Sequence, residues 1–423
     1  MLTGVDVTSV ARIARAVRDG RFRARVFTSA EQAECGAAME RWATRWAAKE
    51  AVRKLAGAAG ERPLPAFRDI EVVRPGGGAP RVLVRGAPAD VAISLSHEGD
   101  MAVAVAVAMP GAAAGGGLHA APLQPVPERW FALPERRVDA HKGTFGTVVV
   151  VGGSPGLSGA PYLAAMGAAR TGAGRIRLCV PAALHPAMVV KCVEVMPHAL
   201  PDGGRGVLGG DATEQLRSSH LPAAQALVVG PGIGLDPATG EALVALLDGL
   251  PCPVVVDADG LTLAAREGLE WRRAGAPVVV TPHPAEMARL LGGGTAVADV
   301  ARDRPAVAAR YAVERGVVVV LKGAWTVVAA PDGRLWTSPY AVPALATGGT
   351  GDVLGGVCGA LLAAGIAGFE AAVTAVTVHA EAGAELEAAR GRAGILASDL
   401  LEHLPVAQER LRRAWERGDS RSP

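Results

Sequence analysis

The chain has 423 residues, half of them hydrophobic, and a formal net charge of +2. One hydrophobic core rarely serves a chain of this length, so we expect two domains. The nearly balanced charge excludes a whole-chain field that would favour nucleic acid or a membrane surface. The longest apolar runs, Val148–Val151 and Val317–Leu321, are far too short to span a bilayer.

The five cysteines are scattered along the chain, and no two form a Cys-x-x-Cys pair. Neither disulfides nor a zinc site is therefore expected, and a reducing cytoplasm fits this cysteine usage. The charged residues Asp6, Arg12 and Arg15 interrupt any apolar stretch near the N-terminus, so a signal peptide is not expected there.

A segment rich in glycine and proline divides the chain. Residues 110–127 read PGAAAGGGLHAAPLQPVP, have no periodicity and are typical of a linker. We therefore expect a small domain over residues 1–109, a large domain over residues 128–410, and a charged tail over residues 411–423.

The first domain contains a Gly-Val-Asp motif that ends at Asp6 and a stretch of good helix formers over Arg41–Gly57. On the predicted helix, Glu50 shares a face with small residues and with Lys54. One interpretation is a Glu50–Lys54 ion pair beside a solvated basic stripe. The alternative is a magnesium ion held by one or two carboxylates and by substrate phosphates. The basic stripe consists of Arg45, Lys49 and Arg53.

A third element of this domain is the sequence SLSH, which ends at His97. Together with GVD, the Phe22–Thr28 stretch, Glu31 and the AKEA sequence around Glu50, it resembles the small trimeric holo-[acyl-carrier-protein] synthases. The resemblance covers residues 1–107. It implies a small α+β domain, and it implies transfer of phosphopantetheine from coenzyme A to acyl carrier protein.

The same resemblance implies roles for individual residues. Asp6 and Glu50 would hold Mg²⁺ on the diphosphate of coenzyme A, and each site would form between the subunits of a trimer. For His97 a structural role in a turn is the alternative. The family's usual glycine turn is less regular here, at Gly57–Gly60. The residues expected to contact coenzyme A or the carrier protein are Arg45, Lys49, Lys54 and His97.

Six short apolar runs rich in β-branched residues recur after residue 140. They do not alternate with polar residues, which is typical of strands buried on both faces. Alanine- and leucine-rich stretches of helical length separate most of them. The sequence therefore predicts an α/β fold with a mostly parallel sheet flanked by helices. The runs are Thr147–Gly153, Arg175–Val180, Ala226–Gly232, Pro253–Asp259, Pro277–His283 and Val317–Gly323.

Five of these runs end in small or polar residues, which places those residues at the carboxyl ends of the strands. Each cluster alone is more typical of a tight turn. Because ligands of open α/β sheets bind at this edge, five clusters together favour a site. The clusters are Gly152-Gly153, Gly230–Gly232, Asp257–Asp259, Thr281–His283 and Lys322-Gly323.

The strongest motif is ATGGTGDVL over Ala346–Leu354. Its glycines free the backbone to approach a phosphate, and the apolar run Val353–Ala364 predicts a helix whose N-terminus faces the same anion. Asp352 falls at the helix start. It is either an N-cap residue or a base that takes a proton from a hydroxyl attacking a phosphoryl group.

The GGTGDVL sequence resembles the anion hole and catalytic aspartate of ribokinase-like kinases. A wider set of motifs is similar to the ADP-dependent (S)-NAD(P)H-hydrate dehydratases, over nearly all of residues 136–405. The set consists of His141–Gly146, Val148–Ser154, Ser158–Ala160, Gly230–Gly234, Asp257–Asp259, Thr281–Glu286, Leu321–Thr326 and Ala346–Leu354.

This second resemblance implies transfer of a phosphoryl group from ADP to the hydroxyl of NAD(P)H hydrate, followed by loss of phosphate. Asp352 would be the base. The hydrate would contact Ala160, Gly234, His283 and Asp352. For His283 a structural turn, and for Lys322 a solvated side chain, are the alternatives. The expected nucleotide site consists of Lys322, Gly323, Ala324, Trp325, Thr326, Gly348, Gly349, Thr350 and Gly351.

The chain departs from this family at two places. Thr262 stands where asparagine usually follows the DAD cluster, and Ala341–Ala344 replace a Gly-Asn-Pro-Gly sequence. Two other hypotheses stay open. GTGD alone also allows a ribokinase-like kinase for a vitamin or sugar, and the first domain also allows a non-catalytic oligomerisation module.

Overall fold

The computed structural model describes residues 2–58, 64–73, 80–84, 87–89, 91–108 and 132–416. Contacts divide the chain into two compact units, residues 1–118 and 119–423, and each unit has its own hydrophobic cores. The expected linker over residues 110–127 lies outside the described residues, as do Ala59 and Gly60 of the glycine turn.

The N-terminal unit is a small α+β fold. In the part of the chain that is described, strands β1, β6 and β5 form one antiparallel sheet in that order, and β2, β3 and β4 form a second. The expected long helix is confirmed as α4, which packs across β1 and β6. The elements are β1 Leu2–Ser9, α1 Val10–Ala16, α2 Gly20–Val26, α3 Ser29–Cys35, α4 Met39–Ala58, β2 Ile70–Val73, β3 Arg81–Val84, β4 Ala87–Pro88, β5 Ala92–Glu98 and β6 Met101–Ala108.

The second unit is built on a nine-stranded sheet, as far as the described residues show, with the strand order β15-β14-β13-β12-β11-β10-β7-β8-β9. The strands from β13 to β9 are parallel, and β14 and β15 extend the sheet by antiparallel pairing. All six predicted strands are present. Strands β9, β14 and β15 were not predicted. The strands are β7 Thr147–Val151, β8 Arg175–Pro181, β9 Met196–Leu200, β10 Ala226–Val229, β11 Val254–Val256, β12 Val278–Val280, β13 Val318–Leu321, β14 Val327–Ala329 and β15 Leu335–Thr337.

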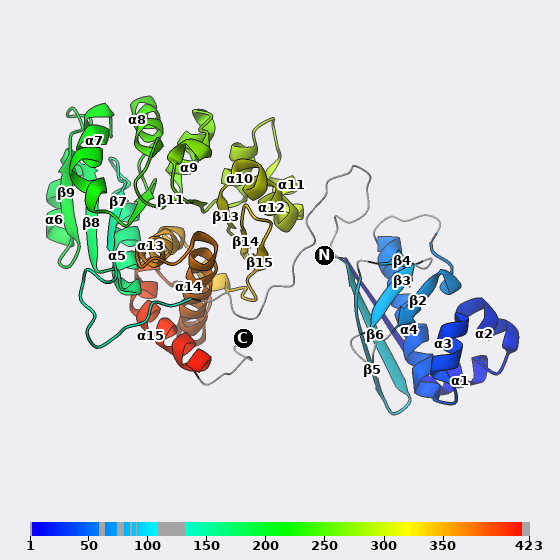
Figure 1. Cartoon of the computed structure of the whole chain (residues 1–423). Coiled ribbons are helices and arrows are strands. Elements are labelled where there is room, and N and C mark those ends of the chain that lie inside the picture. Colours follow the sequence, from blue (N-terminus) through cyan, green and yellow to red (C-terminus); the bar gives the residue numbers. More distant parts are fainter. Residues whose placement is uncertain are drawn as a thin grey trace. The chain divides into compact units, whose positions relative to one another are not determined.

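Helices cover both faces of this sheet (Figure 1). Because successive strand residues point to opposite faces, Val148 and Val150 join one core while Val149 and Val151 join the other. The first core contains α5, α13, α14 and α15, and the second contains α7 to α12. The helices are α5 Gly159–Thr171, α6 His185–Lys191, α7 Gly210–Gln215, α8 Pro237–Leu247, α9 Asp259–Arg266, α10 Pro284–Leu291, α11 Val297–Arg302, α12 Arg304–Arg315, α13 Thr350–Ala363, α14 Gly368–Arg390 and α15 Ala397–Glu416.

The strand order reverses next to β7. From β7 the chain first adds β8 and β9 on one side and then returns to place β10 on the other side. In open α/β sheets the ligand binds at the carboxyl ends of the strands where this reversal occurs. The loops after β7 and β10 are therefore the part of the sheet edge where a ligand is expected.

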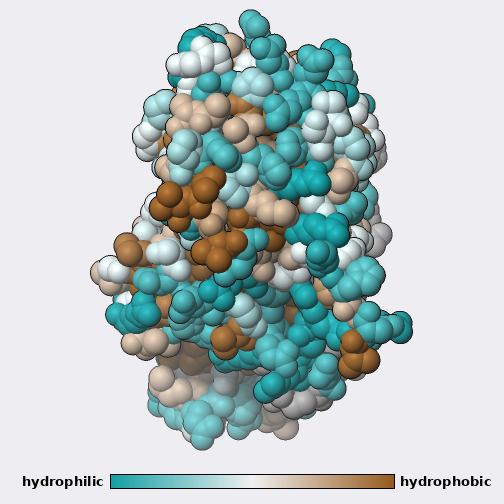
Figure 2. All heavy atoms as spheres, turned by 90° about the vertical axis from the view of Figure 1, so that its left-hand side faces the viewer, coloured by the Kyte–Doolittle hydropathy of each residue, from teal (hydrophilic) through white to brown (hydrophobic). Residues whose placement is uncertain are grey.

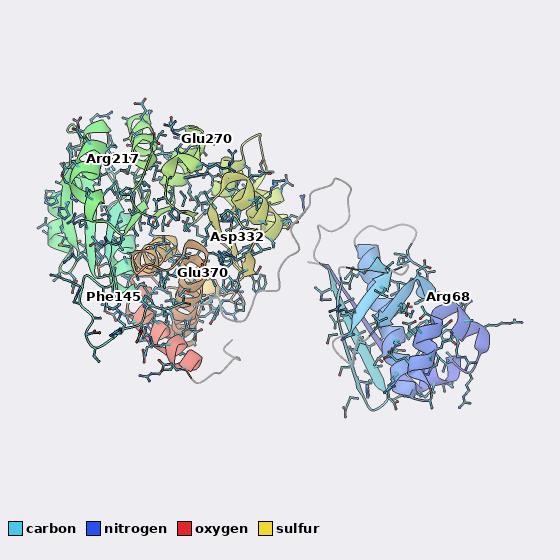
Figure 3. The ribbon with its side chains drawn as sticks, in the orientation of Figure 1. Arg68, Phe145, Arg217, Glu270, Asp332 and Glu370 are labelled. Carbon is cyan, nitrogen blue, oxygen red and sulfur yellow. The ribbon has the colours of Figure 1, made fainter. Side chains whose placement is uncertain are left out.

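Two further features complete the second unit. The β14–β15 hairpin is joined to α14 through Arg334, which pairs with Asp332 at 2.8 Å and with Glu370 at 2.5 Å. Figure 3 labels the two acidic residues, Asp332 in the hairpin and Glu370 in α14. Helix α15 continues past residue 410 to Glu416, and Leu411 packs against the core, so the expected tail boundary is too early. No helix of the described ranges is both long and apolar enough to cross a membrane.

Candidate active site

The ATGGTGDVL motif forms the start of α13, which begins at Thr350, three residues earlier than the apolar run suggested. Gly349 is the N-cap residue with φ of 95°, a left-handed conformation that favours glycine. Among the described residues no side chain caps this end. The Thr350 N–H donates to the Thr347 carbonyl at 3.4 Å. The N–H groups of Gly351 and Asp352, which follow it in the first turn, are the candidates to bind an anion, because the first N–H groups of a helix lack partners within it.

The individual residues of the motif have different roles in this geometry. The Thr350 hydroxyl donates to the carbonyls of Leu345 and Thr347 at 2.8 and 2.9 Å, which fixes the preceding loop. A Cβ added at Gly348 would meet open space, so the backbone of the loop is approachable there. The motif thus combines a fixed turn with an accessible backbone, as phosphate binding requires.

Asp352 lies in the first turn of α13 and is not its N-cap, so the N-cap interpretation is wrong. Burial raises the pKa of this carboxyl to about 7, and the nearby carboxylate of Asp257 adds to the rise. A base whose pKa is close to the working pH is the most effective proton acceptor. The side chain therefore has the property expected of a general base.

Lys322, at the end of β13, lies beside this helix start. Its Nζ is 2.8 Å from Asp257 Oδ1 and 3.8 Å from Glu286 Oε2, and a Cβ added at Gly351 would lie 3.3 Å from it. Burial lowers the pKa of Lys322, but the two carboxylates outweigh that effect and the net pKa is raised. The interpretation as a solvated side chain is therefore wrong.

Asp257, directly after β11, lies at the centre of this cluster, although no role of its own was predicted for it. Its Oδ1 accepts from Lys322 and, at 2.7 Å, from the Thr281 hydroxyl. Its Oδ2 is buried and has no hydrogen-bond partner among the described residues. The only sequence signal was its position at a strand end, in the DAD cluster.

The loop from Lys322 to Thr326 is held from two sides. Arg304, at the start of α12, donates to the carbonyls of Lys322, at 3.4 Å, and of Ala324. The Trp325 N–H donates to the Tyr340 carbonyl at 3.1 Å. Sequence analysis missed Arg304, because no local pattern indicates which loop a distant arginine contacts.

Two members of this loop have unusual features. Trp325 has a positive φ of 54° and a side chain that is 55% exposed. The Thr326 hydroxyl donates to the Gly323 carbonyl at 3.0 Å, which closes the turn. An exposed aromatic ring in a loop that the fold holds in a strained conformation is more typical of a ligand contact than of packing.

Two of the residues expected at the hydrate lie together in the loops after β7 and β10. The Gly234 N–H donates to Asp259 Oδ2 at 3.1 Å, and a Cβ added at Gly234 would meet the Ser154 hydroxyl at 3.1 Å. Ala160, near the start of α5, packs against Gly232 of the same loop. These residues occupy the strand-order reversal identified above.

His283 caps α10 and also reaches the lysine cluster. Its Nδ1 accepts from the N–H groups of Ala285 and Glu286 at 3.1 and 3.3 Å, so the structural interpretation is confirmed. Burial lowers the pKa of His283, and Lys322 lowers it further. The neutral ring therefore carries its proton on Nε2, which lies 3.4 Å from Glu286 Oε1.

A buried histidine of α14 supports the start of α13. His379 Nε2 lies 2.8 Å from the Thr350 carbonyl, and because a carbonyl only accepts, this nitrogen carries the proton. Burial lowers the pKa of His379 to about 4, so the ring is neutral at ordinary pH. His379 was also missed by sequence analysis, since it lies in an alanine-rich helix far along the chain.

In the N-terminal unit, Asp6 faces helix α4. Gly4 lies directly against α4, since a Cβ there would be 1.9 Å from the Ala51 carbonyl oxygen, and Asp6 is on the same face of β1. Lys54 Nζ pairs with Asp6 Oδ1 at 2.7 Å. The structure thus pairs Lys54 with Asp6 and not, as one interpretation had it, with Glu50, which lies beside Ala51 on the facing helix.

The expected solvated basic stripe is wrong. The Lys49 side chain is 0% exposed, pairs with Glu31 at 2.8 Å and donates to the carbonyls of Phe67 and Ile70. Arg45 is 4% exposed and pairs with Glu34 at 2.5 Å. A buried and fully paired ammonium has no donor left for coenzyme A or a carrier protein, so we withdraw Lys49 from the expected contacts.

His97 lies within strand β5 opposite Ala102 and is exposed, so its role in a turn is not supported. Across the described parts of the chain, no group of three or more histidine, cysteine or acidic residues is placed to hold a metal ion. A divalent ion in the N-terminal unit therefore requires ligands from a substrate in addition to Asp6 and Glu50.

A sequence profile of the NAD(P)H-hydrate dehydratase family matches residues 148–406. The chain belongs to this family. A relative from Neisseria meningitidis, named ADP-dependent (S)-NAD(P)H-hydrate dehydratase, is 39% identical over 273 residues, which cover 63% of this chain and 86% of the relative. A second profile, described as the 4'-phosphopantetheinyl transferase superfamily, matches residues 3–108.

A relative from Moorella thermoacetica, named bifunctional NAD(P)H-hydrate repair enzyme, is 41% identical over 279 residues, 66% of this chain and 52% of the relative. The chain therefore spans about half the length of that relative. An ADP/ATP-dependent NAD(P)H-hydrate dehydratase from Bacillus subtilis, crystallised with ATP/Mg²⁺, superposes with a TM-score of 0.57 and 32% identity over 66% of this chain and 94% of that one.

The expected fold class is also confirmed. A ribokinase-like superfamily protein from Enterococcus faecalis superposes with a TM-score of 0.55 and 25% identity, over 66% of this chain and 92% of that one. Residues 148–406 thus match the hydrate-dehydratase family, and the second unit has a ribokinase-like fold.

Proposed function

We propose that the second unit catalyses ADP-dependent dehydration of (S)-NAD(P)H hydrate, which returns NAD(P)H and releases AMP and phosphate. The observation that carries the proposal is Asp352, a half-buried carboxyl whose pKa is raised to about 7 in the first turn of a helix that no side chain of the described residues caps. Phosphoryl transfer to a hydroxyl requires this combination of a base and an anion site.

In the proposed mechanism, Asp352 accepts the proton of the ring hydroxyl as that oxygen bonds to the β-phosphorus of ADP and AMP leaves. The N–H groups at the start of α13, around Gly349 and Gly351, stabilise the negative charge that grows on the phosphoryl oxygens. The C–O bond of the phosphate ester then breaks, phosphate leaves with the bonding electrons, and the adjacent ring carbon loses a proton. The ring double bond is thereby restored.

The nucleotide would lie between the Lys322–Thr326 loop and the Gly348–Gly351 loop. The contact between Lys322 and Gly351, which brings the two loops together, supports this placement. Asp257 and Glu286 hold Lys322 in position. We propose ADP as the donor because the Neisseria relative is named ADP-dependent, although the Bacillus protein is named ADP/ATP-dependent.

The hydrate would lie against Ala160, Gly234 and His283, next to Asp352. The position of Ala160 and Gly234 beside the strand-order reversal supports this assignment, because ligands of open α/β sheets bind there. The neutral ring of His283 lies at the same edge.

The return of absorbance at 340 nm on incubation with hydrated NADH and ADP tests the proposal. Asp352→Asn should lower the rate by about 10²–10⁴-fold, the usual contribution of a general base, while ADP binding measured by calorimetry persists. A stable phosphorylated vitamin or sugar, formed without repair of the hydrate, would support the alternative kinase function.

We also propose that the N-terminal unit transfers phosphopantetheine from coenzyme A to a serine of acyl carrier protein. Its match to the transferase superfamily and the position of Asp6 beside helix α4, which carries Glu50 and Lys54, support this function. Two carboxylates together with substrate phosphates fit Mg²⁺, which would neutralise the diphosphate of coenzyme A. Lys54, Arg45 and His97 remain the proposed contacts of coenzyme A or the carrier, and trimerisation through this unit is part of the proposal.

Modification of apo-acyl carrier protein in the presence of coenzyme A and Mg²⁺ tests this second function. Asp6→Ala and Glu50→Ala should each abolish the mass increase of the carrier, with unchanged circular dichroism. If the unmutated chain never modifies a carrier protein, the non-catalytic oligomerisation module is the better explanation. For both functions we propose a cytoplasmic setting, which the five free cysteines fit.

A further inference from the structure

The Lys322–Thr326 loop contains an unusual backbone conformation at Trp325. Its φ of 54° is left-handed, which is unfavourable for a residue other than glycine and persists only where surrounding contacts hold it. Figure 2 shows hydrophobic residues at several places on one face of the molecule, so an exposed apolar side chain does not by itself indicate a site. The backbone of Trp325, and not the exposure of its ring, therefore requires an explanation.

Two hydrogen bonds anchor this part of the loop to the segment that follows β15. The Trp325 N–H donates to the Tyr340 carbonyl at 3.1 Å, and the Ser338 N–H donates to the Thr326 carbonyl at 2.8 Å. Ser338 is buried, and its hydroxyl oxygen accepts from the Tyr340 N–H at 3.2 Å. The segment after β15 therefore supports one side of the loop, while Arg304 holds carbonyls on the other side.

The side chain of Tyr340 connects this segment to helix α14. Its hydroxyl lies 2.6 Å from Glu381 Oε2. Burial and this hydrogen bond raise the pKa of Tyr340 above its usual range, so the hydroxyl stays protonated and is the donor. The Glu381 side chain is 8% exposed, and its other oxygen lies 3.2 Å from Arg410 of α15. The acceptor is thus a carboxylate fixed by a counter-ion, and hydrogen bonds to such groups are stronger than those between neutral groups.

The same helix also supports the second loop of the proposed nucleotide site. His379 Nε2 donates to the carbonyl of the first residue of α13 at 2.8 Å, and Glu387 accepts from the Ala344 N–H at 3.1 Å. A Cβ added at Gly383 would lie 2.7 Å from the Leu345 side chain. Because residues four apart share a helix face, His379, Gly383 and Glu387 form one row on α14. Helix α14 is thus a common support for the two loops between which the nucleotide would lie.

We propose that Tyr340 is a positioning residue for the nucleotide, and that its hydrogen bond to Glu381 holds the Lys322–Thr326 loop in the conformation that binds ADP. This inference rests on the proposed ADP-dependent reaction. The Tyr340 hydroxyl is engaged with Glu381, so its effect passes along the backbone, from the Tyr340 carbonyl to the Trp325 N–H. Loss of the hydroxyl should therefore weaken nucleotide binding and have little effect on the chemistry at Asp352 once the nucleotide is bound.

Calorimetric titration of the full chain with ADP tests the inference. Tyr340→Phe removes only the hydroxyl and should weaken ADP binding by about 5- to 20-fold, because the strained backbone loses one of its anchors. Tyr311→Phe is the matched control, since Tyr311 is 3% exposed and its hydroxyl accepts from Trp271 Nε1 at 2.9 Å. This control should also lower the melting temperature, but it should leave the affinity for ADP unchanged.

A pair of substitutions at Glu381 tests the hydrogen bond itself. Glu381→Gln keeps an oxygen that can accept from Tyr340 and should retain the ADP affinity to within about threefold. Glu381→Leu has no acceptor and should reproduce the loss seen for Tyr340→Phe. In hydrate repair, Tyr340→Phe should raise KM for ADP and leave kcat within about twofold, a split that a general loss of folded protein does not produce.

The outcomes separate this inference from the function on which it rests. Equal ADP affinities of Tyr340→Phe and the unmutated chain overturn the role of Tyr340, and so does an equal loss in the two Glu381 variants. If the unmutated chain binds no ADP, the proposed function fails and the inference fails with it. Because ADP binding is measured without the hydrate, the role of Tyr340 is tested even if hydrate repair is not observed.

Discussion

Both units of the protein bury a lysine next to carboxylates, but the two clusters differ in their ratio of acidic to basic groups. Lys49 in the small unit has one acidic partner, Glu31, and two backbone carbonyls, and Glu31 accepts two further N–H groups. Lys322 in the large unit has Asp257 and Glu286 as partners, with Asp352 nearby. The first cluster is neutral and complete, whereas the second has an excess of acid.

This difference separates a structural ion pair from a reactive one. Burial of a charge does not by itself indicate chemistry, since hydrogen bonds from both partners close the Lys49–Glu31 pair and leave no donor of Lys49 for a ligand. In the second cluster, burial and then the carboxylate of Asp257 raise the pKa of Asp352. Asp352 also lies at a helix start that no side chain of the described residues caps, where a phosphoryl group can be bound.

The largest effect on stability is expected at the balanced cluster. Lys49→Met should lower the free energy of unfolding of the N-terminal unit by about 3–5 kcal/mol, since it leaves Glu31 buried without its counter-ion. Scanning calorimetry of the full chain measures the loss as a lower transition temperature for this unit. Arg12→Met, an exposed change in the same unit, is the control and should alter it by less than about 0.5 kcal/mol. Equal effects of the two changes would show that Lys49 is not structural.

In the cluster around Lys322, removal of a charge should raise the stability of the fold and not lower it. A rise in the pKa of Asp352 from 3.8 to about 7 means that its ionised form destabilises the folded state, by at most ~4 kcal/mol above pH 7. Asp352→Asn should therefore raise the melting temperature at pH 8, and the gain should shrink as the pH falls from 7 towards 4. Asp299→Asn on the exposed α11 should show no such trend. A gain that is independent of pH would refute the raised pKa.

The neighbours of Asp352 should move the pH profile of hydrate repair in opposite directions. As a base, Asp352 must be ionised, so kcat/KM should fall as the pH drops below about 7. Glu286→Gln removes a negative charge and should move this limb to lower pH, while Lys322→Met removes a positive charge and should move it to higher pH. Each shift should be roughly 0.5–1 pH unit or more. Shifts in the same direction would show that another group controls the limb.

The smallest effect is expected at His379, which supports the anion site without touching the substrate. His379→Phe removes the donor to the Thr350 carbonyl and should lower kcat by roughly tenfold, with KM for hydrate little changed. His379→Gln, which keeps an N–H donor, should recover most of the rate. If both variants lose activity equally, packing and not the hydrogen bond explains the role of His379.

The sequence predicted the strands and helices whose own residues show a clear apolar or glycine-rich pattern. The six β-branched runs became strands because residues buried on both faces must be continuously apolar, and the GGTGD motif marked the start of a helix. The short strands β9, β14 and β15 escaped prediction, since a few residues, some of them exposed, show no clear periodicity. The early start of α13 was missed because glycines at Gly349 and Gly351 conceal a helical turn.

The contacts between distant segments were beyond a reading of the sequence. A helical wheel places Lys49 on a face of α4, but it cannot show that Phe67 and Ile70 close over that face. In the same way Asp257 and Lys322 meet only because β11 and β13 end at one edge of the sheet. The pattern of apolar runs thus predicts which residues lie at the carboxyl edge of the sheet. The tertiary packing determines which of these residues form ion pairs.

The balance of products tests the central claim most directly, namely that Asp352 accepts a proton while the helix start binds a transferring phosphoryl group. Hydrated NADH and ADP should yield NADH, AMP and phosphate in equal amounts with the unmutated chain. Asp352→Asn should yield none of the three above background although ADP still binds. Full product formation by Asp352→Asn, or NADH release without AMP, would contradict the account.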